Sequence, residues 1–179
     1  MLKLGFIGTG NMASALIKSV LEDAQIISSD KSEEKLQKAK QEFHLNTTKN
    51  NKEVMRSSEI IFLCAKPKDF PEILEEIKSE ASSKIIVSIA AGVKIDFIEK
   101  ILGKNKKIIR VMPNLNCVIG EMAAAYSCNK NVTGKEKGII KNLLDKAGLA
   151  LEIEEQDMDA VTALSGSGPA FVAFIIKAF

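Results

Sequence analysis

The chain begins Met1-Leu2-Lys3-Leu4-Gly5-Phe6-Ile7-Gly8-Thr9-Gly10-Asn11-Met12-Ala13, and this stretch decides the fold. Residues 2–7 form a short apolar run that predicts a buried strand, and residues 11–21 have the pattern of the helix that follows it. Gly8 permits the tight turn between them, Gly10 lets a ligand approach the backbone, and Ala13 lets the helix pack closely on the strand. The N–H groups at the start of the helix, from Asn11 and Met12, would face phosphates. We therefore predict that this turn binds the pyrophosphate of a dinucleotide.

After this turn, short β-rich runs alternate with longer amphipathic segments, as in a parallel sheet covered by helices. Continuous apolar runs such as residues 59–65 are typical of strands buried on both faces. The expected strands are residues 2–7, 25–29, 46–48, 59–65, 84–89 and 107–112, and the expected helices are 11–21, 32–40, 50–56, 70–80, 93–102 and 135–146. Residues 122–126 and 149–153 complete the unit. The sequence therefore predicts one doubly wound α/β domain over residues 1–154.

Composition and charge limit the possible partners. The 179 residues are 46% hydrophobic and 27% charged, with a net charge of +2, so neither nucleic acid nor an anionic membrane is indicated. No uninterrupted apolar run reaches the roughly 18 residues of a membrane-spanning helix. The chain has three widely spaced cysteines and one histidine, His44, so we expect no metal site and a reducing, cytoplasmic location.

The end of the second strand carries the residues expected to contact the adenosine part of the dinucleotide. Asp30 lies 20 residues beyond Gly10, where an acid commonly holds the ribose hydroxyls of NAD. Ser29, Lys31 and Ser32 could instead hold the 2′-phosphate of NADP, and Ser32 also suits the N-cap of the next helix. The residues alone leave NAD and NADP both open.

Three further strand ends should meet at the ligand-binding edge of the sheet, beyond the carboxyl ends of its strands. They are Ala65-Lys66-Pro67, Ala90-Ala91-Gly92 and Met112-Pro113-Asn114, the last preceded by Arg110-Val111. Their small residues would let a flat nicotinamide ring lie close to the backbone. Taken singly, each is an ordinary loop, whereas three in register favour a binding site.

The C-terminal 25 residues read as two helices joined by a glycine- and serine-rich turn. Residues 156–165 predict one helix and residues 168–179 another, which is apolar on nearly all sides and needs a partner subunit or a further segment to bury it. Between them, Ser165, Gly166, Ser167 and Gly168 could direct N–H groups and hydroxyls onto a substrate carboxylate. The alternative is a flexible link between helices.

These motifs together resemble pyrroline-5-carboxylate reductase. The resemblance rests on Gly8 to Met12, Ala65-Lys66-Pro67, Ala90-Ala91-Gly92, Arg110 to Asn114 and Ala163 to Ala170, in that order along the whole chain. It implies a Rossmann-type, mainly parallel sheet followed by the first helices of an all-α dimerisation domain, which would begin at residue 155 and be truncated here. It also implies reduction of Δ1-pyrroline-5-carboxylate to L-proline, usually with NADPH, by a homodimer or higher homo-oligomer.

The resemblance also assigns site residues by motif. The pyrophosphate would lie against Gly8, Gly10, Asn11 and Met12, the adenosine end against Ser29, Asp30 and Lys31, the nicotinamide against Ala65, Lys66, Pro67, Ala90, Ala91, Gly92, Met112, Pro113 and Asn114, and the imine carboxylate against Ser165, Gly166, Ser167 and Gly168. Two departures bear on the loop near the ring. Leu115-Asn116 stands where the family usually has Thr-Pro, and Met122 stands where it commonly has glycine.

The catalytic chemistry expected of such a site depends mainly on positioning. No residue stands out as a general acid, and His44 lies before the third strand, away from the ligand edge, so we expect catalysis by orienting an already protonated imine. Two alternatives stay open. One is another imine or hydroxyacid dehydrogenase of similar layout, which should carry a catalytic lysine, although Lys177 lacks the expected context. The other is a non-catalytic nucleotide-binding fragment.

Overall fold

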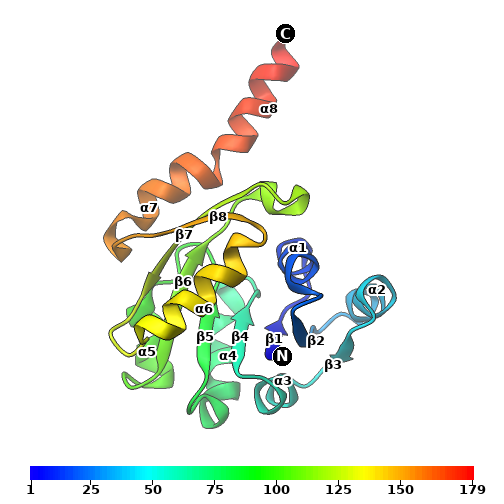
Figure 1. The fold of residues 1–179 in the computed structure, drawn as a ribbon, viewed down its shortest axis with the longest axis vertical. Helices are drawn as coiled ribbons and strands as arrows, with labels where there is room; N and C mark the ends of the chain where they lie inside the picture. Colours follow the sequence, from blue (N-terminus) through cyan, green and yellow to red (C-terminus); the bar gives the residue numbers. More distant parts are fainter.

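The computed structural model describes residues 1–179 and contains one eight-stranded sheet (Figure 1). Its strands are β1 (Leu2–Ile7), β2 (Ala24–Ser29), β3 (Asn46–Thr48), β4 (Ile60–Leu63), β5 (Ile85–Ser88), β6 (Lys107–Met112), β7 (Met122–Cys128) and β8 (Gly148–Glu152). The spatial order is β3-β2-β1-β4-β5-β6-β7-β8. Strands β1 to β6 are parallel, β7 is antiparallel to β6, and β8 pairs parallel to β7. The predicted doubly wound, mainly parallel sheet is confirmed.

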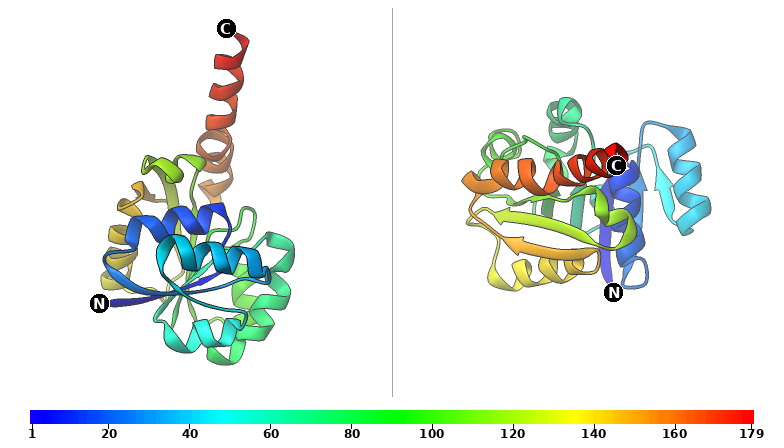
Figure 2. Two further views of the ribbon diagram at one scale, coloured as in Figure 1. Left: turned by 90° about the vertical axis from the view of Figure 1, so that its right-hand side faces the viewer. Right: turned by 90° about the horizontal axis from the view of Figure 1, so that it is seen from above.

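Helices cover both faces of the sheet, as the views in Figures 1 and 2 show. The α-helices are α1 (Asn11–Val20), α2 (Glu33–Phe43), α3 (Asn51–Ser57), α4 (Phe70–Ile77), α5 (Ile95–Leu102), α6 (Gly134–Asp145), α7 (Met158–Val161) and α8 (Gly168–Ala178). Shorter helical turns are η1 (Pro67–Asp69), η2 (Lys78–Glu80), η3 (Leu115–Ile119), η4 (Glu155–Asp157) and the π-helical η5 (Thr162–Gly166). Helices α1, α2 and α6 pack on one face, and α3, α4 and α5 pack on the other.

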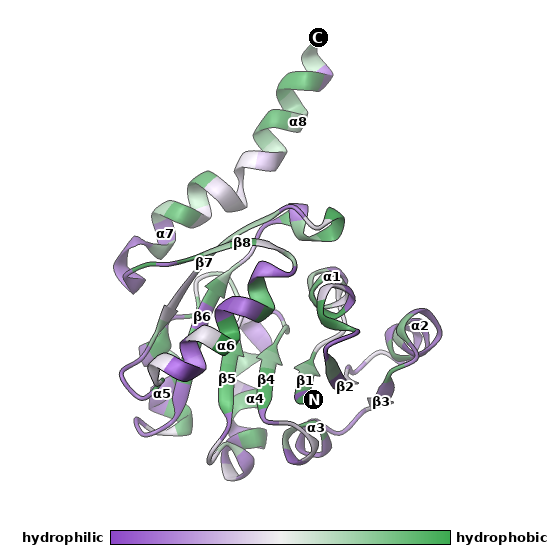
Figure 3. Cartoon of the chain, viewed as in Figure 1, coloured by the Kyte–Doolittle hydropathy of each residue, from purple (hydrophilic) through white to green (hydrophobic).

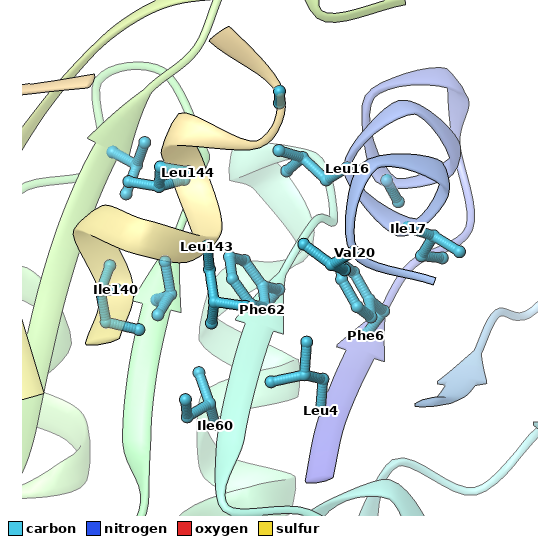
Figure 4. Close-up of a cluster of buried hydrophobic side chains, with 14 of the residues drawn as sticks. Leu4, Phe6, Leu16, Ile17, Val20, Ile60, Phe62, Ile140, Leu143 and Leu144 are labelled. Atoms are coloured by element: carbon cyan, nitrogen blue, oxygen red, sulfur yellow. The ribbon is translucent and has the colours of Figure 1, made fainter. Parts of the chain in front are cut away.

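The face under α1 and α6 holds the larger of two hydrophobic cores (Figure 4). Leu16 and Val20 of α1 and Leu143 of α6 point toward the strands, where the rings of Phe6 and Phe62 stack with centroids 4.8 Å apart. The second core lies under α3, α4 and α5. Because β1, β4 and β5 are covered on both sides, their inner residues are apolar apart from Ser88 of β5, and this explains the continuous runs in the sequence.

Helix ends follow the expected chemistry in several places. The Ser32 hydroxyl caps α2 by accepting from the Lys35 N–H, and Thr133 and Glu136 form a reciprocal capping box at α6. Two predicted helices are shorter than expected. Residues 78–80 continue α4 as a 3-10 turn, and α5 begins at Ile95 because Val93 is buried in the preceding turn and Lys94 is extended.

The C-terminal segment forms one continuous helical run, Glu155–Ala178, that leaves the body of the molecule (Figures 1 and 2). The expected break between two helices is wrong, because the π-helical turn Thr162–Gly166 joins α7 to α8. The most apolar 18-residue window of this run has a mean hydropathy of 1.4 and none of the window is buried, so by length and composition the run could cross a membrane. Soluble proteins also contain such helices, and no uninterrupted apolar run predicts this one because serines and glycines divide it.

Figure 3 shows how apolar residues dominate α8 where it projects from the sheet. Its large side chains are more than half exposed, and none of its residues is buried. An exposed apolar helix of this kind needs a partner subunit or a further segment of chain to cover it.

Candidate functional site

The first glycine turn has the geometry that requires glycine. Gly8 has φ +100°, and its N–H donates to the Ser29 carbonyl at 2.7 Å. A Cβ at Gly8 would lie 2.9 Å from the carbonyl carbon and oxygen of Cys64, closer than real Cβ contacts. The turn therefore passes directly over the end of β4, and only a residue without a side chain fits there.

The start of α1 is open to a ligand. Gly10 is the N-cap, no side chain caps the helix, and no atom lies within 4 Å of a Cβ built on Gly10. Asn11 is exposed, whereas Met12 packs partly against the larger core. A helix N-terminus with uncapped N–H groups beside an unfilled space fits a phosphate group.

A cavity of about 420 Å³ lies beside this turn. It combines the ends of β1, β2 and β4 with the starts of α3 and η1, and it includes seven of the predicted cofactor residues. These are Gly8, Gly10, Ser29, Asp30, Lys31, Ala65 and Lys66. Cys64, which directly precedes the predicted Ala65 at the same strand end, also lines the cavity, and sequence reasoning missed the further lining residues Ile7, Lys35, Asn51, Lys68, Asp69 and Ile73. Most of these follow or adjoin a strand end, which was the only signal available for them.

Asp30 holds the glycine turn in place. Its Oδ2 accepts from the Thr9 N–H at 2.9 Å and the Thr9 hydroxyl at 3.2 Å, and its Oδ1 accepts from the Ser32 N–H at 2.9 Å. Lys35 Nζ lies 3.5 Å from Oδ2. Partial burial alone would raise the pKa of Asp30, but the hydrogen bonds from Thr9 and Ser32 and the charge of Lys35 outweigh it and lower the pKa below 3.8. Most of the lone pairs of this carboxylate are thus already used.

The neighbouring residues Ser29 and Lys31 differ from their simplest predicted roles. Ser29 is buried, and its hydroxyl donates to Asn51 Oδ1 at 2.7 Å rather than pointing freely at a ligand. Asn51 in turn donates to Glu76 at 2.7 Å. Lys31 is exposed and pairs with Glu72 at 3.1 Å. Ser29 therefore supports this edge through Asn51, and Lys31 supplies an exposed positive charge paired with Glu72.

The other strand ends lie along the same edge of the sheet. Ala65 and Lys66 border the cavity, and Pro67 opens η1. Pro67 and Gly92, which has φ +74°, border an adjacent groove of about 420 Å³ at the start of α5. Ala91 is exposed, whereas Ala90 is buried in the second core, so only the main chain of Ala90 can face a ligand.

The Met112-Pro113-Asn114 segment contacts the C-terminal helical run. Asn114 is buried, and its Nδ2 lies 3.4 Å from both the carbonyl and the hydroxyl oxygen of Ser165. Its Oδ1 accepts from the Ala123 N–H at 3.1 Å. The methyl group of Met112 lies 2.9 Å from where a Cβ of Gly166 would be. The structure thus brings together two motifs that are 50 residues apart in sequence.

The predicted anion site in this segment is only partly available. The Ser165 hydroxyl donates to the Ala123 carbonyl at 3.0 Å, and the Ser167 N–H donates to the Thr162 carbonyl at 3.1 Å. The sequence predicted free N–H and hydroxyl groups at a helix start here. Instead, the Ser165 hydroxyl is engaged by Ala123 of β7, and the Ser167 N–H is engaged within the π-helical turn. The Ser167 side chain is half-buried, and its hydroxyl has no hydrogen-bond partner within the chain.

A groove of about 470 Å³ lies where Asn114 meets Ser165. It is lined by Asn114, Asn116, Leu164, Ser165, Pro169, Val172, Ala173 and Ile176. None of these side chains titrates near neutral pH. Asn116 belongs to the first departure from the family pattern, where residues 115–119 form a 3-10 turn, and Met122 of the second departure is buried in the larger core.

The remaining titratable candidates lie elsewhere. His44 ends α2 and precedes β3, so it is at the sheet edge opposite the ligand edge. Burial raises the pKa of Cys64 far above its usual range and raises those of Cys117 and Cys128 to about 11. No three His, Cys, Asp or Glu side chains are grouped so as to hold a metal ion.

The fold and this edge together define a class: a Rossmann-type, NAD(P)-binding oxidoreductase domain. Residues 3–92 match the family model described as NADP oxidoreductase coenzyme F420-dependent, and residues 155–179 match the model of pyrroline-5-carboxylate reductase dimerisation. The chain is 40% identical to the pyrroline-5-carboxylate reductase of Aquifex aeolicus, over 99% of this chain and 67% of that relative. The chain belongs to the pyrroline-5-carboxylate reductase family.

Solved structures agree with this assignment. The pyrroline carboxylate reductase of Plasmodium falciparum with NADP bound superposes with a TM-score of 0.90 at 35% identity, covering 99% of this chain and 67% of that one. The enzyme of Coxiella burnetii superposes with a TM-score of 0.92 at 30% identity, covering 98% and 67%. This chain therefore spans about two thirds of the length of these relatives.

Proposed function

We propose that this chain reduces Δ1-pyrroline-5-carboxylate to L-proline by hydride transfer from NADPH, the last step of proline biosynthesis. One observation carries the proposal: Met112 and Asn114 contact Ser165 and Gly166 at the ligand edge. Hydride donor and acceptor must lie within roughly 3–3.5 Å of each other, so loops that hold the two rings have to meet. Family membership favours this reaction over that of another imine or hydroxyacid dehydrogenase.

The residues assigned to the site divide the work along the sheet edge. Gly8, Gly10 and the first N–H groups of α1 would hold the pyrophosphate, since the space beside Gly10 is unfilled. The main chain of residues 65–67, 90–92 and 112–114 would support the nicotinamide, which supplies the hydride when bound. The Ser167 hydroxyl, which has no hydrogen-bond partner within the chain, would bind the imine carboxylate together with the other groups of residues 165–168.

The proton needed by the imine nitrogen would arrive with the substrate. The groove at Asn114 and Ser165 is lined by amides, one hydroxyl and apolar side chains, none of which can act as a general acid near neutral pH. The chain would therefore select and orient an imine that is already protonated. We expect kcat/KM to fall at high pH with the pKa of the substrate imine. A decline governed instead by an enzyme group would contradict this assignment.

We propose NADPH as the preferred cofactor. Asp30 is engaged by Thr9, Ser32 and Lys35, which leaves it poorly placed to accept both ribose hydroxyls of NADH. Four lysines, Lys31, Lys35, Lys66 and Lys68, line the same cavity and would attract a 2′-phosphate.

Parallel titrations with NADPH and NADH test this preference. Replacing both Lys31 and Lys35 by Gln should weaken NADPH binding about 30-fold and NADH binding much less, because each lost charge contact contributes roughly 1 kcal/mol. Lys38→Gln, on the exposed side of α2, is the matched control. Tighter binding of NADH by the unmodified protein would reject the proposal.

We also propose that residues 1–154 are the dinucleotide-binding domain and that residues 155–179 begin the helical substrate and dimerisation domain. The helical run would form a homodimer or higher homo-oligomer through α8. The exposed side chains of Phe171, Phe174 and Ile176 support this proposal. Light scattering should show that Phe171→Glu with Phe174→Glu dissociates the assembly. Three free cysteines fit a cytoplasmic location.

A further inference from the structure

Arg110 of β6 is a buried cation that the proposed mechanism does not use. Its side chain is 2% exposed, and it is among the largest fully buried side chains of the chain. Placing a guanidinium inside a protein is unfavourable unless carboxylates and hydrogen bonds compensate it. A cation on the fourth residue of a central strand, among isoleucines and valines, therefore needs a specific partner.

Its partners both come from the start of the C-terminal helical run. Nη1 donates to Glu155 Oε1 at 3.3 Å, and Nη2 donates to Asp159 Oδ1 at 3.4 Å. Glu155 is 29% exposed and Asp159 is 75% exposed, so Glu155 is the better shielded partner. The same Glu155 oxygen accepts from the Ile95 N–H at 2.8 Å, at the start of α5. Glu155 thus joins β6, α5 and the helical run.

The contacts of Arg110 belong to a series along one side of β6 and its continuation. Arg110, Met112 and Asn114 are two residues apart, so in an extended chain they face the same way. Arg110 contacts residues 155 and 159, Met112 contacts Gly166, and Asn114 contacts Ser165. The helical run therefore has two attachments to β6, an ionic one at its first turns and an amide one at Ser165.

We infer that Arg110, through Glu155, is a positioning residue for substrate binding. It fixes the first turn of the helical run, and the second attachment then sets residues 165–168 against Met112 and Asn114. Arg110 does not touch substrate or cofactor in this account. The inference rests on the proposed function, because it assigns those residues to the imine carboxylate.

The test compares Arg110→Met, Arg110→Lys and Glu155→Gln with the unmodified protein. Lys107→Met is the matched control, because Lys107 lies on the same strand and its Nζ pairs with Glu136 Oε1 of α6 at 2.5 Å, away from the ligand edge. Arg110→Met should raise KM for pyrroline-5-carboxylate about tenfold or more, since small misplacements of a substrate-holding group have large effects. KM for NADPH should stay within about twofold, and Arg110→Lys should restore part of the loss. Lys107→Met should change neither KM.

Amide hydrogen exchange gives a readout that does not depend on turnover. In Arg110→Met and Glu155→Gln, exchange should become faster at residues 155–168 and at Ile95, and stay unchanged in β1 and α1. Parallel increases in both KM values, or an unchanged KM for the imine, would overturn the inference. So would unchanged exchange at residues 155–168. An unmodified protein that binds NADPH but does not reduce pyrroline-5-carboxylate would refute the proposed function instead. The exchange data would still show whether Arg110 and Glu155 fix the first turn of the helical run to β6.

Discussion

The two glycines of the first turn should respond to alanine in opposite ways. Gly8 has φ +100°, and a Cβ there would meet the Cys64 carbonyl at 2.9 Å. The left-handed conformation costs about 1–2 kcal/mol for alanine, and the backbone shift needed to relieve the contact costs about 1–3 kcal/mol more. Gly8→Ala should therefore lower the melting temperature by roughly 4–20 °C, at 2–4 °C per kcal/mol for a chain of this size.

Gly10→Ala should leave the fold intact and weaken cofactor binding. Gly10 has φ −75° and no atom within 4 Å of a Cβ, so its stability should change by less than about 0.5 kcal/mol. The added methyl group would occupy space that the pyrophosphate needs, and a clash of about 1–3 kcal/mol corresponds to a Kd roughly 5- to 150-fold higher.

Thermal denaturation and titration of NADPH fluorescence measure the two effects separately. Gly138→Ala, in the interior of α6 with open space around it, is the control: it should leave NADPH binding unchanged and raise the melting temperature by about 2–4 °C, because alanine favours a helix interior over glycine by about 1 kcal/mol. Equally tight NADPH binding by Gly10→Ala and the unmodified protein would show that no pyrophosphate lies beside Gly10. An unchanged melting temperature of Gly8→Ala would show that glycine is not required at that turn.

Three further predictions concern stability, pH and thiol chemistry. Asp30→Asn should lose stability that is fully present above pH 3.8, the ordinary pKa of the group. The unmodified protein loses this stability as the pH falls through the lowered pKa of Asp30. Urea titrations at pH 3 to 7 would show the two proteins converging in acid, and a constant difference in their free energies of unfolding would contradict the lowered pKa. Gly148→Ala should destabilise the chain by more than about 3 kcal/mol, because φ is +146° and a Cβ would lie 2.2 Å from the Met122 carbonyl oxygen; urea denaturation would measure this. Cys64, Cys117 and Cys128 should react slowly with a disulfide reagent at pH 8, since burial raises all three pKa values, and rapid labelling of the folded protein would show that description to be wrong.

Much of the fold could be predicted from local sequence. Strands such as Leu2–Ile7 and Lys107–Met112 were bounded correctly because apolar runs covered on both faces end abruptly at glycine, lysine or proline. The glycine turn could also be predicted, because few backbone conformations let a turn pass so closely over Cys64. These features depend on residues that are adjacent in sequence.

Contacts between distant residues could not be predicted in the same way. The sequence suggested a helix start at residues 165–168, but Met112, Asn114 and Ala123 contact this turn from about 40 to 55 residues away. A π-helical turn joins the two helices there. The engagement of Ser29 with Asn51 and of Arg110 with Glu155 likewise depends on tertiary packing. Their residue types fit a site, but the partners that restrict them appear only in three dimensions.

Hydride transfer from a nicotinamide to a cyclic imine can be followed directly with an isotope. The chain would be incubated with pyrroline-5-carboxylate and NADPH that carries deuterium at its transferable position, and the product would be examined by mass spectrometry. We expect L-proline with one deuterium on the ring carbon that was doubly bonded to nitrogen. NADPH binding without labelled proline would contradict it.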